Sequence, residues 1–489
     1  MRLLFCLLIL LVVPELSGAT AAKAGVRELF QNGVQDSLSG TPPVSGDSER
    51  LFIDEIDLKG NMLTRSKTIM REIPFQTGDT LDLHTLEQKV EAGRLNLMNT
   101  GLFNFVQTDL HITEQAHAIV TYSFVERWNI WPFPVIELDE PNLNQWLENP
   151  SFSTINYGMD LLMMNLTGRN ERSRIMVKAG NVQSLGLVIQ TPLLGERQTF
   201  RTALIYNMNR TKRRAYATEN NQQLYFRDSD DFISNEYRIG TSLSWRPAYY
   251  NTHNVRFFYH YHDYADTLTT LNPRFGPNGE NRFSFLSLSY MFRRDRRDIA
   301  AYPLDGHLLE AGITRKGLWF PKDAVMDVTT LEGTIRHYIP LQNRWYAAWS
   351  MTGKWSEGTT LSYFDQEGLG FTHALVRGYE NYLISGQKYV VAKSNIKHNL
   401  LPERESTIGF IRNEKFSRIH YALYANVFLD AGMISDRHHN SDETLANRWL
   451  AGAGAGLDFH TYYDTVLRAE VTINRHGKGG VFFHLSAPI

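Results

Sequence analysis

The chain has 489 residues and is nearly neutral, with 50 Lys and Arg against 52 Asp and Glu and a formal net charge of −2. That balance gives no electrostatic basis for binding nucleic acid, so we expect no nucleic-acid partner. The mean hydropathy of −0.32 is usual for a soluble protein. It also fits a membrane barrel, because barrel strands expose only alternate residues to lipid.

The N-terminal residues have the features of a secretion signal, which we assign to residues 1–21. Arg2 supplies a positive charge, and residues 3–13 form an apolar run that is too short to cross a bilayer as a helix. Cys6 lies in this run and is the only cysteine, so we expect neither disulfides nor thiol chemistry in the mature protein. Residues 22–50 are rich in Gly, Pro and Ser and predict a flexible linker.

Residues 51–127 predict a small α+β domain with the element order β-α-α-β-β. The first strand ends at the turn Gly60-Asn61, and Thr64 or Ser66 is the candidate N-cap of the first helix. Apolar residues then recur at helical spacing until Thr100-Gly101 ends the second helix. The expected elements are a strand at 52–58, helices at 69–73 and 83–98, and strands at 103–112 and 118–125.

From residue 128 to residue 489 the sequence alternates between apolar and polar residues, which is typical of strands with two different faces. Membrane strands need about 9–11 residues each, so sixteen of them fit here with turns and loops. A soluble β-sandwich or propeller is the alternative, but the region lacks a blade-length repeat and is long for a sandwich. We therefore predict a mainly β protein with a sixteen-stranded antiparallel transmembrane β-barrel. The alternating segments lie near 128–138, 153–164, 171–180, 184–191, 199–209, 237–245, 255–261, 282–290, 305–315, 327–339, 344–356, 387–400, 417–430, 448–460, 464–475 and 479–487.

Polar stretches between these segments predict the connections. Residues 212–234 and 267–280 are long and predict extracellular loops, whereas the short link 458–465 predicts a turn at the other end of the barrel. Several aromatic residues fall near strand ends, as expected for aromatic girdles at the membrane interfaces. They are Trp245, Tyr249, Tyr250, Trp319, Trp345, Trp349 and Trp355.

The sequence offers no clear site for covalent or metal chemistry. His260 and His262 share a face of a predicted strand, as a pair of metal ligands would, and Asp263 follows them. Without a third ligand, polar side chains that face the barrel interior are the favoured interpretation. His438-His439 lies in a polar loop and is uninformative. Because we find no nucleophile with a base and no phosphate loop, we predict no enzyme, no metal site and no cofactor.

Two short motifs predict one enclosed ion pair. They are Val376-Arg377-Gly378-Tyr379, between the eleventh and twelfth predicted strands, and Phe428-Leu429-Asp430-Ala431-Gly432, on the thirteenth. Alternate residues of a strand share a face, so Phe428, Asp430 and Gly432 point the same way. Gly378 permits a tight turn, and Gly432 leaves room for an incoming loop. Because Arg377 is always charged, it needs a carboxylate if it is enclosed, and we predict that Asp430 is its partner.

These elements together resemble the BamA-like family of outer-membrane barrels. Residues 51–127 look like the family's POTRA domain, through Gly60-Asn61, Gly78, residues 99–106 and residues 125–127. The motif around Arg377 is similar to the tip of the family's long sixth extracellular loop, and the motif around Asp430 is similar to its barrel-wall motif. The resemblance implies that these residues latch the loop to the wall and do not perform chemistry.

A third stretch also resembles a motif of this family. Asp295-Arg296-Arg297-Asp298, followed by Pro303 and Gly306, is similar to the family's Asp-x-Arg-Asp…Pro-x-x-Gly hairpin between successive strands. Asp295, Arg297 and Asp298 could be mistaken for part of a nucleic-acid patch, but the paired aspartates oppose that interpretation. We expect a solvated, ion-paired turn.

The resemblance implies a location in the outer membrane of a Gram-negative bacterium, with the POTRA domain and the linker in the periplasm. The implied role is assembly or insertion of outer-membrane proteins, or translocation of polypeptides. The implied partners are membrane lipid, unfolded outer-membrane or secreted polypeptide clients, and accessory periplasmic subunits. A secretion pore for one dedicated partner, or a passive channel, remains the alternative.

The family's implied route for clients is the seam between the first and last barrel strands. Pro132 and Pro134 in the first strand, and Gly479-Gly480 and Pro488 in the last, are expected to weaken pairing across this seam. The chain departs from the family in having a single POTRA-like unit and in ending at Ile489 instead of an aromatic residue.

Overall fold

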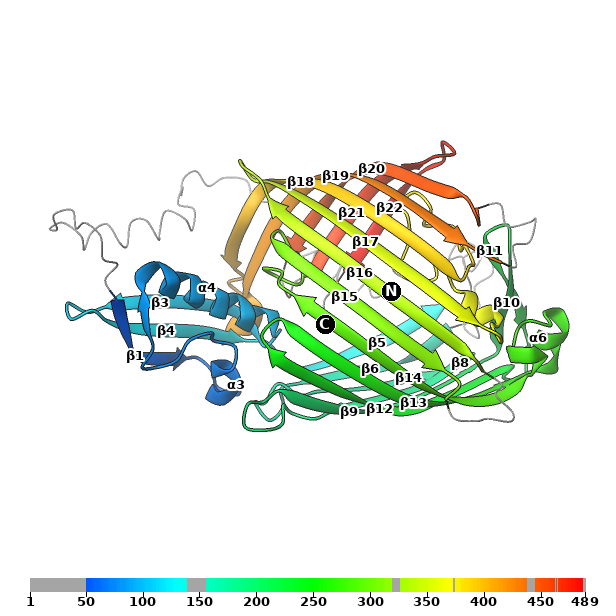
Figure 1. The fold of residues 1–489 in the computed structure, drawn as a ribbon, viewed down its shortest axis with the longest axis horizontal. Helices are drawn as coiled ribbons and strands as arrows, with labels where there is room; N and C mark the ends of the chain where they lie inside the picture. Colours follow the sequence, from blue (N-terminus) through cyan, green and yellow to red (C-terminus); the bar gives the residue numbers. More distant parts are fainter. Residues whose placement is uncertain are drawn as a thin grey trace.

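The computed structural model describes residues 50–138, 155–318, 326–372, 374–437, 445–461, 463 and 465–486. The predicted signal, residues 22–49 of the predicted linker, Trp319, His438-His439 and Pro488 lie outside these residues, whereas Arg50, predicted as the last linker residue, begins the first strand. Among the described helices, none has both the length and the apolar character needed to cross a membrane. The chain forms a small domain with a four-stranded sheet, placed at one end of a sixteen-stranded sheet that curves into a barrel (Figure 1).

The N-terminal domain follows the predicted order with one addition, a three-residue strand between the two helices. Its elements are β1 (Arg50–Lys59), α3 (Ser66–Met70), β2 (Thr80–Asp82), α4 (Leu83–Asn99), β3 (Phe103–Ile112) and β4 (His117–Glu126). The sheet has the order β2-β1-β4-β3, and β1 runs parallel to β4. Ile53, Leu86, Phe103 and Tyr122 are fully buried in its core. Burial also raises the pKa of the Tyr122 hydroxyl.

The start of α3 corrects the predicted helix cap. Arg65 occupies the N-cap position and makes no side-chain capping hydrogen bond, so neither Thr64 nor Ser66 caps this helix. Thr64 is buried instead, and its backbone N–H donates to Oε1 of Glu126 at 2.7 Å. The Thr64 hydroxyl, which a cap would use, instead accepts from Nδ2 of Asn165 at 2.9 Å.

All sixteen predicted barrel strands are present in one antiparallel sheet, which confirms the fold class. The sheet follows chain order, with β9 next to β12. Its strands are β5 (Ile130–Leu138), β6 (Ile155–Met164), β7 (Arg172–Ala179), β8 (Val182–Gln190), β9 (Phe200–Thr211), β12 (Ser234–Ala248), β13 (Asn251–Tyr264), β14 (Arg282–Asp295), β15 (Gly306–Lys316), β16 (Val328–Pro340), β17 (Trp345–Gly358), β18 (Lys388–Thr407), β19 (Arg418–Ser435), β20 (Trp449–Thr461), β21 (Thr465–Asn474) and β22 (Gly479–Ser486).

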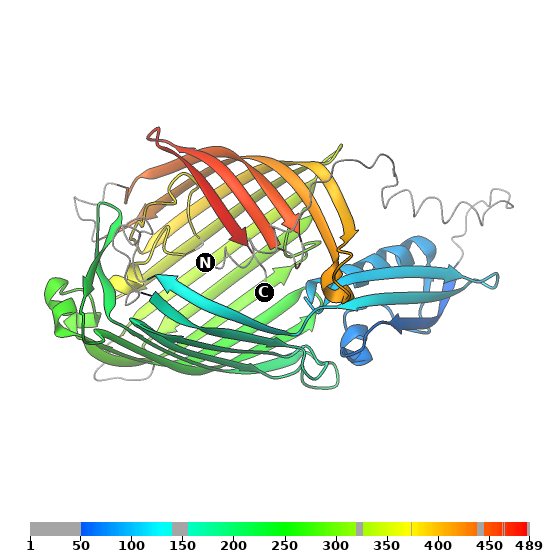
Figure 2. The ribbon, with the colours of Figure 1, turned by 180° about the vertical axis from the view of Figure 1, so that it is seen from behind.

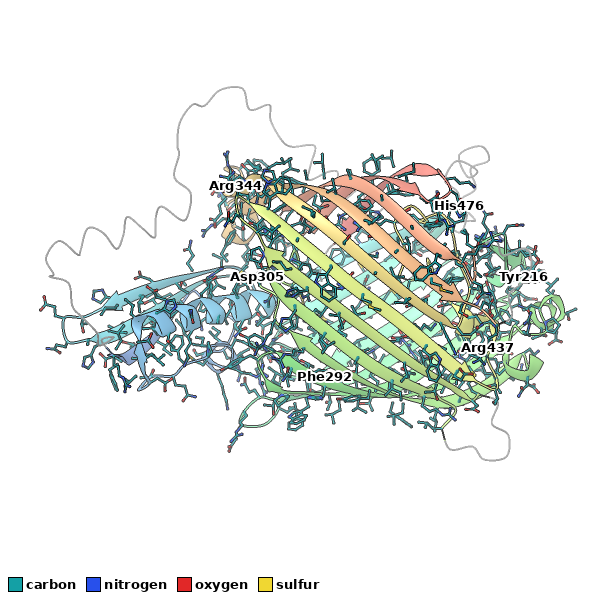
Figure 3. The ribbon with its side chains drawn as sticks, turned by 45° about the horizontal axis from the view of Figure 1, so that its top comes forward. Tyr216, Phe292, Asp305, Arg344, Arg437 and His476 are labelled. Carbon is teal, nitrogen blue, oxygen red and sulfur yellow. The ribbon has the colours of Figure 1, made fainter. Side chains whose placement is uncertain are left out.

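Alternation along each strand separates an apolar outer face from a polar inner face. On β19, Val427 and Leu429 are 53% and 61% exposed, whereas Asn426, Phe428 and Asp430 between and beside them are buried. Outward side chains surround the whole wall (Figure 3). Those that are apolar and exposed include Leu204, Ile239, Leu243, Leu288, Ile313, Leu331, Ile335, Met351, Ile396, Leu457 and Val471. Such a band is what a lipid-facing barrel wall requires.

The connections divide between the two ends of the barrel. Asp305 and Arg344 lie at the end next to the N-terminal domain, and Tyr216, Arg437 and His476 lie at the far end (Figure 3). Most turns at the near end are short, whereas the far end carries the longer loops. Two small helical elements, η3 (Tyr363–Gln366) and α7 (Glu414–Ser417), lie in connections at the far and near ends, respectively.

Two stretches predicted as plain loops contain regular structure. Residues 212–234 include a hairpin of β10 (Arg213–Glu219) and β11 (Gln222–Arg227). Residues 267–280 include most of α6 (Asp266–Leu271) and the turn η2 (Pro277–Gly279). Tyr216 and Phe226 of the hairpin pack on a cluster that contains buried Leu268 and Phe275. A few apolar residues in polar surroundings therefore order these loops.

The sheet is not closed in the part of the chain that the structure describes. No ladder joins the edge strands β5 and β22, and Figure 2 shows the two strands apart. Pro132 and Pro134 pair with Leu161 and Met159 of β6 in an unbroken register. Proline has no N–H, and N–H groups of alternate residues point to one side. Because the ladder to β6 is continuous, the nitrogens of Pro132 and Pro134 face the free edge of β5. That edge therefore lacks two hydrogen-bond donors.

Candidate functional site: a loop latched to the barrel wall

The connection between β17 and β18, here called the latch loop, packs against the inside of the barrel wall. Its tip, Val376–Tyr379, is followed by a return to β18. Val376 is 1% exposed and Tyr379 is 2% exposed, and both belong to an apolar cluster with Val391 of β18 and Ile434 of β19. Apolar burial therefore brings the charged residue between them against the wall.

Arg377 meets Asp430 in a bidentate ion pair. Its Nε donates to Oδ2 at 2.8 Å and its Nη2 donates to Oδ1 at 2.7 Å. The backbone N–H of Arg377 donates to the same Oδ2 at 3.2 Å. The guanidinium carbon also lies 3.6 Å from the centroid of the Phe428 ring. Because Asp430 is 1% exposed and Arg377 is 8% exposed, each charge depends on the other for solvation.

Arg377 contacts a second carboxylate, which the sequence interpretation missed. Its Nη1 donates to Oε1 of Glu470 at 3.2 Å, and Glu470 on β21 is 2% exposed. Glu470 occupies an inward position that alternates with the outward, 61% exposed Val471. That alternation was the available signal, because a glutamate on the inner face of a barrel strand needs a cation.

Glycines on β19 and β20 make room for the loop tip. A Cβ on Gly432 would lie 2.7 Å from Cγ2 of Val376, and a Cβ on Gly452 would lie 1.7 Å from the carbonyl oxygen of Arg377. Gly378 itself has a φ of +94°, which favours glycine. Gly432 and Gly378 were predicted to serve the loop, whereas Gly452 was not. Its place in the run Ala451-Gly452-Ala453-Gly454 was the signal, since glycine in a strand often marks a close approach.

The fold and the latch define the class of this protein: an outer-membrane-type β-barrel with a latched internal loop, preceded by one POTRA-like domain. Two family models match the chain. They are the POTRA model, described as surface antigen variable number repeat, over residues 51–127, and the Omp85 superfamily domain over residues 165–461. The second match covers more than half of the chain, and the chain belongs to the Omp85 superfamily.

Two solved structures are similar in fold. One is BamA from Haemophilus ducreyi lacking POTRA domains 1–3, with 14% sequence identity and a TM-score of 0.48 over 89% of this chain and 84% of that chain. The other is CdiB from Escherichia coli, with 14% identity and a TM-score of 0.49 over 90% of this chain and 76% of that chain. Among curated proteins, none matches the chain.

The Asp-x-Arg-Asp turn lies between β14 and β15 and is more buried than predicted. Asp295 accepts hydrogen bonds from Nε and Nη2 of Arg297 at 2.8 and 2.7 Å, and the Arg297 side chain is only 7% exposed. Asp298 accepts from the backbone N–H of Leu304 at 3.1 Å, although burial raises the pKa of this carboxyl. Gly306, with a φ of +92°, closes the turn after Pro303.

Tyr302 of the same turn reaches into the barrel, which the sequence interpretation did not anticipate. Its hydroxyl donates to Oδ2 of Asp458 at 2.7 Å. Asp458 is fully buried and also accepts from Nε of Arg468 at 2.7 Å. The Lys397 ammonium lies 3.9 Å from the centroid of the Tyr302 ring. The turn therefore anchors a second network of buried charges on the inner wall.

The same turn contacts the POTRA domain on its other side. Nδ2 of Asn99 donates to the carbonyl oxygen of Asp298 at 2.8 Å, and Oδ1 of Asn99 accepts from the backbone N–H of Ala300 at 2.8 Å. Asn99 is the last residue of α4. One turn thus joins the POTRA domain to the interior of the barrel.

A buried carboxylate fixes the POTRA domain at a second turn, between β12 and β13. Glu72 is 1% exposed and accepts from Nη1 and Nη2 of Arg246 at 2.7 and 2.8 Å. Tyr249, predicted as a girdle residue, donates its hydroxyl to the carbonyl oxygen of Ile73 at 3.0 Å. Burial, with Glu72 nearby, raises the pKa of the Tyr249 hydroxyl. This tyrosine therefore holds the domain and does not simply face lipid.

The histidine pair lies on β13, where both rings stack with aromatic neighbours. His260 lies 4.4 Å and His262 lies 5.7 Å from the Phe285 ring, centroid to centroid. His260 Nε2 is 2.9 Å from the Ser287 hydroxyl, and His262 Nδ1 is 2.8 Å from the Tyr264 hydroxyl. These contacts match aromatic packing and hydrogen bonding on the inner face. Within the described residues, no cluster of His, Cys, Asp or Glu has a metal-binding arrangement.

Proposed function

We propose that this protein resides in the outer membrane of a Gram-negative bacterium, with its POTRA domain in the periplasm. We propose further that it assembles or inserts outer-membrane proteins, or translocates polypeptides. Membership of the Omp85 superfamily supports this role. The observation that carries the proposal is the unpaired seam between β5 and β22 in a barrel that holds a latched loop on β19 and β21, close to the β22 edge.

The seam offers two unequal edges to a client strand. An unpaired strand edge is a template for pairing with another chain. The free edge of β5 lacks the donors of Pro132 and Pro134, whereas the described residues of β22 include no proline. We infer that β22 is the better template and that β5 is the edge that separates.

Pairing of a client strand with a barrel edge needs no covalent chemistry, so we propose that the protein is not an enzyme.

The POTRA domain supplies a further edge. In the sheet order β2-β1-β4-β3, strand β3 pairs only with β4, so one side of Phe103–Ile112 is free. We propose that unfolded outer-membrane or secreted polypeptides add a strand there before reaching the seam. Accessory periplasmic subunits can use the same edge.

Depletion followed by quantitative outer-membrane proteomics tests the proposal. An assembly factor is needed for many barrels, so we expect the levels of several outer-membrane proteins to fall together. Loss of a single exported protein would instead indicate a dedicated secretion pore.

Reconstitution separates assembly from passive conduction. Liposomes that contain the full chain are expected to accelerate the folding of an added outer-membrane barrel relative to empty liposomes. Ion conductance without any such acceleration would contradict the assembly role.

A further inference from the structure

A cavity of about 450 Å³ lies between the latch loop and the barrel wall. Loop residues Thr372, Ala374 and Arg377 bound one side, and the inner faces of β16, β17 and β18 bound the other. Its lining includes several basic residues and no acidic one. The basic residues are Arg336, Arg377, Lys393, Lys397 and Arg468.

Two wall carboxylates near the cavity are already engaged by other cations. Both oxygens of Asp430 accept from Arg377. Asp458 accepts from Nε and Nη2 of Arg468 at 2.7 and 3.0 Å, and Lys397 lies 3.8 Å from the same carboxylate. Together with Glu470, which accepts from Nη1 of Arg377, three carboxylates thus balance the charges of Arg377, Lys397 and Arg468.

Arg336 and Lys393 form no comparable pair. Lys393 is the cross-strand neighbour of Asp430, yet Arg377 occupies both oxygens of that carboxylate. In the described part of the chain, neither Arg336 nor Lys393 has a carboxylate oxygen within the 4.0 Å that defines an ion pair. Among the described residues, Arg336 and Lys393 are therefore two positive charges beside the latch that have no ion-pair contact with a carboxylate.

Strand register brings these two residues to one place. Arg336 of β16 and Lys393 of β18 are both paired with Ser350 of β17. Neighbouring strands lie about 4.8 Å apart, so the two Cα atoms are roughly 10 Å apart. All three residues line the cavity. Both long side chains can therefore reach a single ligand placed over Ser350.

We propose that Arg336, Ser350 and Lys393 bind a small inorganic oxyanion of the phosphate or sulfate type. A guanidinium, an ammonium and a hydroxyl offer donors to a ligand that accepts through all its oxygens. Thr334 and Thr352 add hydroxyl groups to the same lining. A bound anion also neutralises two charges that repel Arg377. Occupancy of the site therefore stabilises the latched loop.

The test is a phosphate titration of the full-length chain in detergent micelles at constant ionic strength, with sodium chloride as the balancing salt. The readout is the temperature at which the folded, fast-migrating band is lost on electrophoresis. We expect a saturable rise of about 2–4 °C, because a ligand that binds only the folded state stabilises it. Phosphate also stabilises proteins non-specifically, but that effect does not saturate.

Variants distinguish the site from a general salt effect. Lys393→Met and Arg336→Gln are expected to abolish the saturable rise and to remain folded, because each removes a charge that forms no ion-pair contact within the described residues. Lys393→Arg should keep the rise. Arg404→Gln is the matched control, since it removes one positive charge from an exposed position of the same strand. A wild-type protein without a saturable rise, or an equal rise in Lys393→Met, would overturn the proposal.

Discussion

The barrel has two contrasting sides, the latched wall and the seam. On the latched wall, β19 to β21 form continuous ladders, β18 pairs with β19 along a ladder that has two register shifts, and the loop tip adds a buried ion pair. At the seam, β5 and β22 share no ladder among the described residues, and β5 carries two prolines on its free edge. The same sheet is thus reinforced on one side and left open on the other.

Under the proposed function, this difference would let one barrel be stable at the latch and open at the seam. Burying Arg377 and Asp430 together costs desolvation of two charges, which close pairing offsets. The result is a wall in which the loop cannot leave without exposing a charge. An opening is then confined to the seam, where no strand pairing has to be broken.

The largest expected effect comes from breaking the latch. Arg377→Ala removes the guanidinium that holds both oxygens of buried Asp430 and one oxygen of Glu470, whereas Asp430→Ala leaves Arg377 with Glu470 as its remaining carboxylate. Each variant should lose about 3–5 kcal/mol of stability, measured by urea unfolding in micelles and by loss of heat-resistant migration. Glu91→Ala, which breaks an exposed ion pair on α4, is the control and should cost less than about 1 kcal/mol. A loss at Arg377 no larger than that of the control would contradict the buried latch.

A smaller effect is expected from filling the space under the loop. Gly452→Ala places a Cβ 1.7 Å from the carbonyl oxygen of Arg377, so the loop tip must move. Overpacking of this kind costs about 1–3 kcal/mol, measured as a lower unfolding midpoint in the same assay. Gly409→Ala is the matched control, because a Cβ there would have no atom within 4 Å. Equal behaviour of the two variants would show that the tip does not rest on Gly452.

A comparable or smaller effect is expected where the POTRA domain meets the barrel. Glu72→Gln keeps the shape of the side chain but weakens two charge-assisted hydrogen bonds to Arg246, a loss of about 1–3 kcal/mol in docking. The outcome should be faster proteolysis of the junction near residue 127, with heat-resistant migration of the barrel unchanged. Unchanged proteolysis would indicate that this carboxylate does not hold the domain.

The smallest expected effect comes from repairing the seam. Replacing Pro132 and Pro134 with Val restores two donors on the free edge of β5, worth about 0.5–1.5 kcal/mol each if they find acceptors on β22. We expect slightly greater heat resistance and slower client folding in liposomes. Pro247→Val, at the bulge between β12 and β13, is the control and should not slow clients. Faster client folding in the seam variant would contradict a seam that must open.

Much of the barrel could be predicted from the sequence because the alternation of apolar and polar residues is visible within each strand. Alternation identified each of the sixteen strands, and the count placed Arg377 in the loop before the twelfth strand and Asp430 on the thirteenth. Glycine spacing also indicated where the wall admits the loop. Period-two patterning is strong evidence when one face of a sheet contacts lipid.

The remaining features depend on contacts between distant segments. Glu470 and Tyr302 contact the charged groups of the inner wall only because register and a turn bring them there, and the Thr64 hydroxyl bonds to Asn165 and does not cap the helix. The hairpin β10–β11 was missed because a few apolar residues order an otherwise polar stretch. The prolines and glycines of the edge strands predicted weak pairing across the seam. The lack of a ladder between the described parts of β5 and β22 follows from the geometry of the whole sheet.

A double-mutant cycle on Arg377 and Asp430 tests the central claim most directly. The free energy of unfolding would be measured for the wild type, Arg377→Ala, Asp430→Ala and the double variant in the same micelles. Because either substitution already breaks the ion pair, we predict that the double variant is little less stable than each single one. This corresponds to a coupling of about 3 kcal/mol. Fully additive losses would contradict the latch.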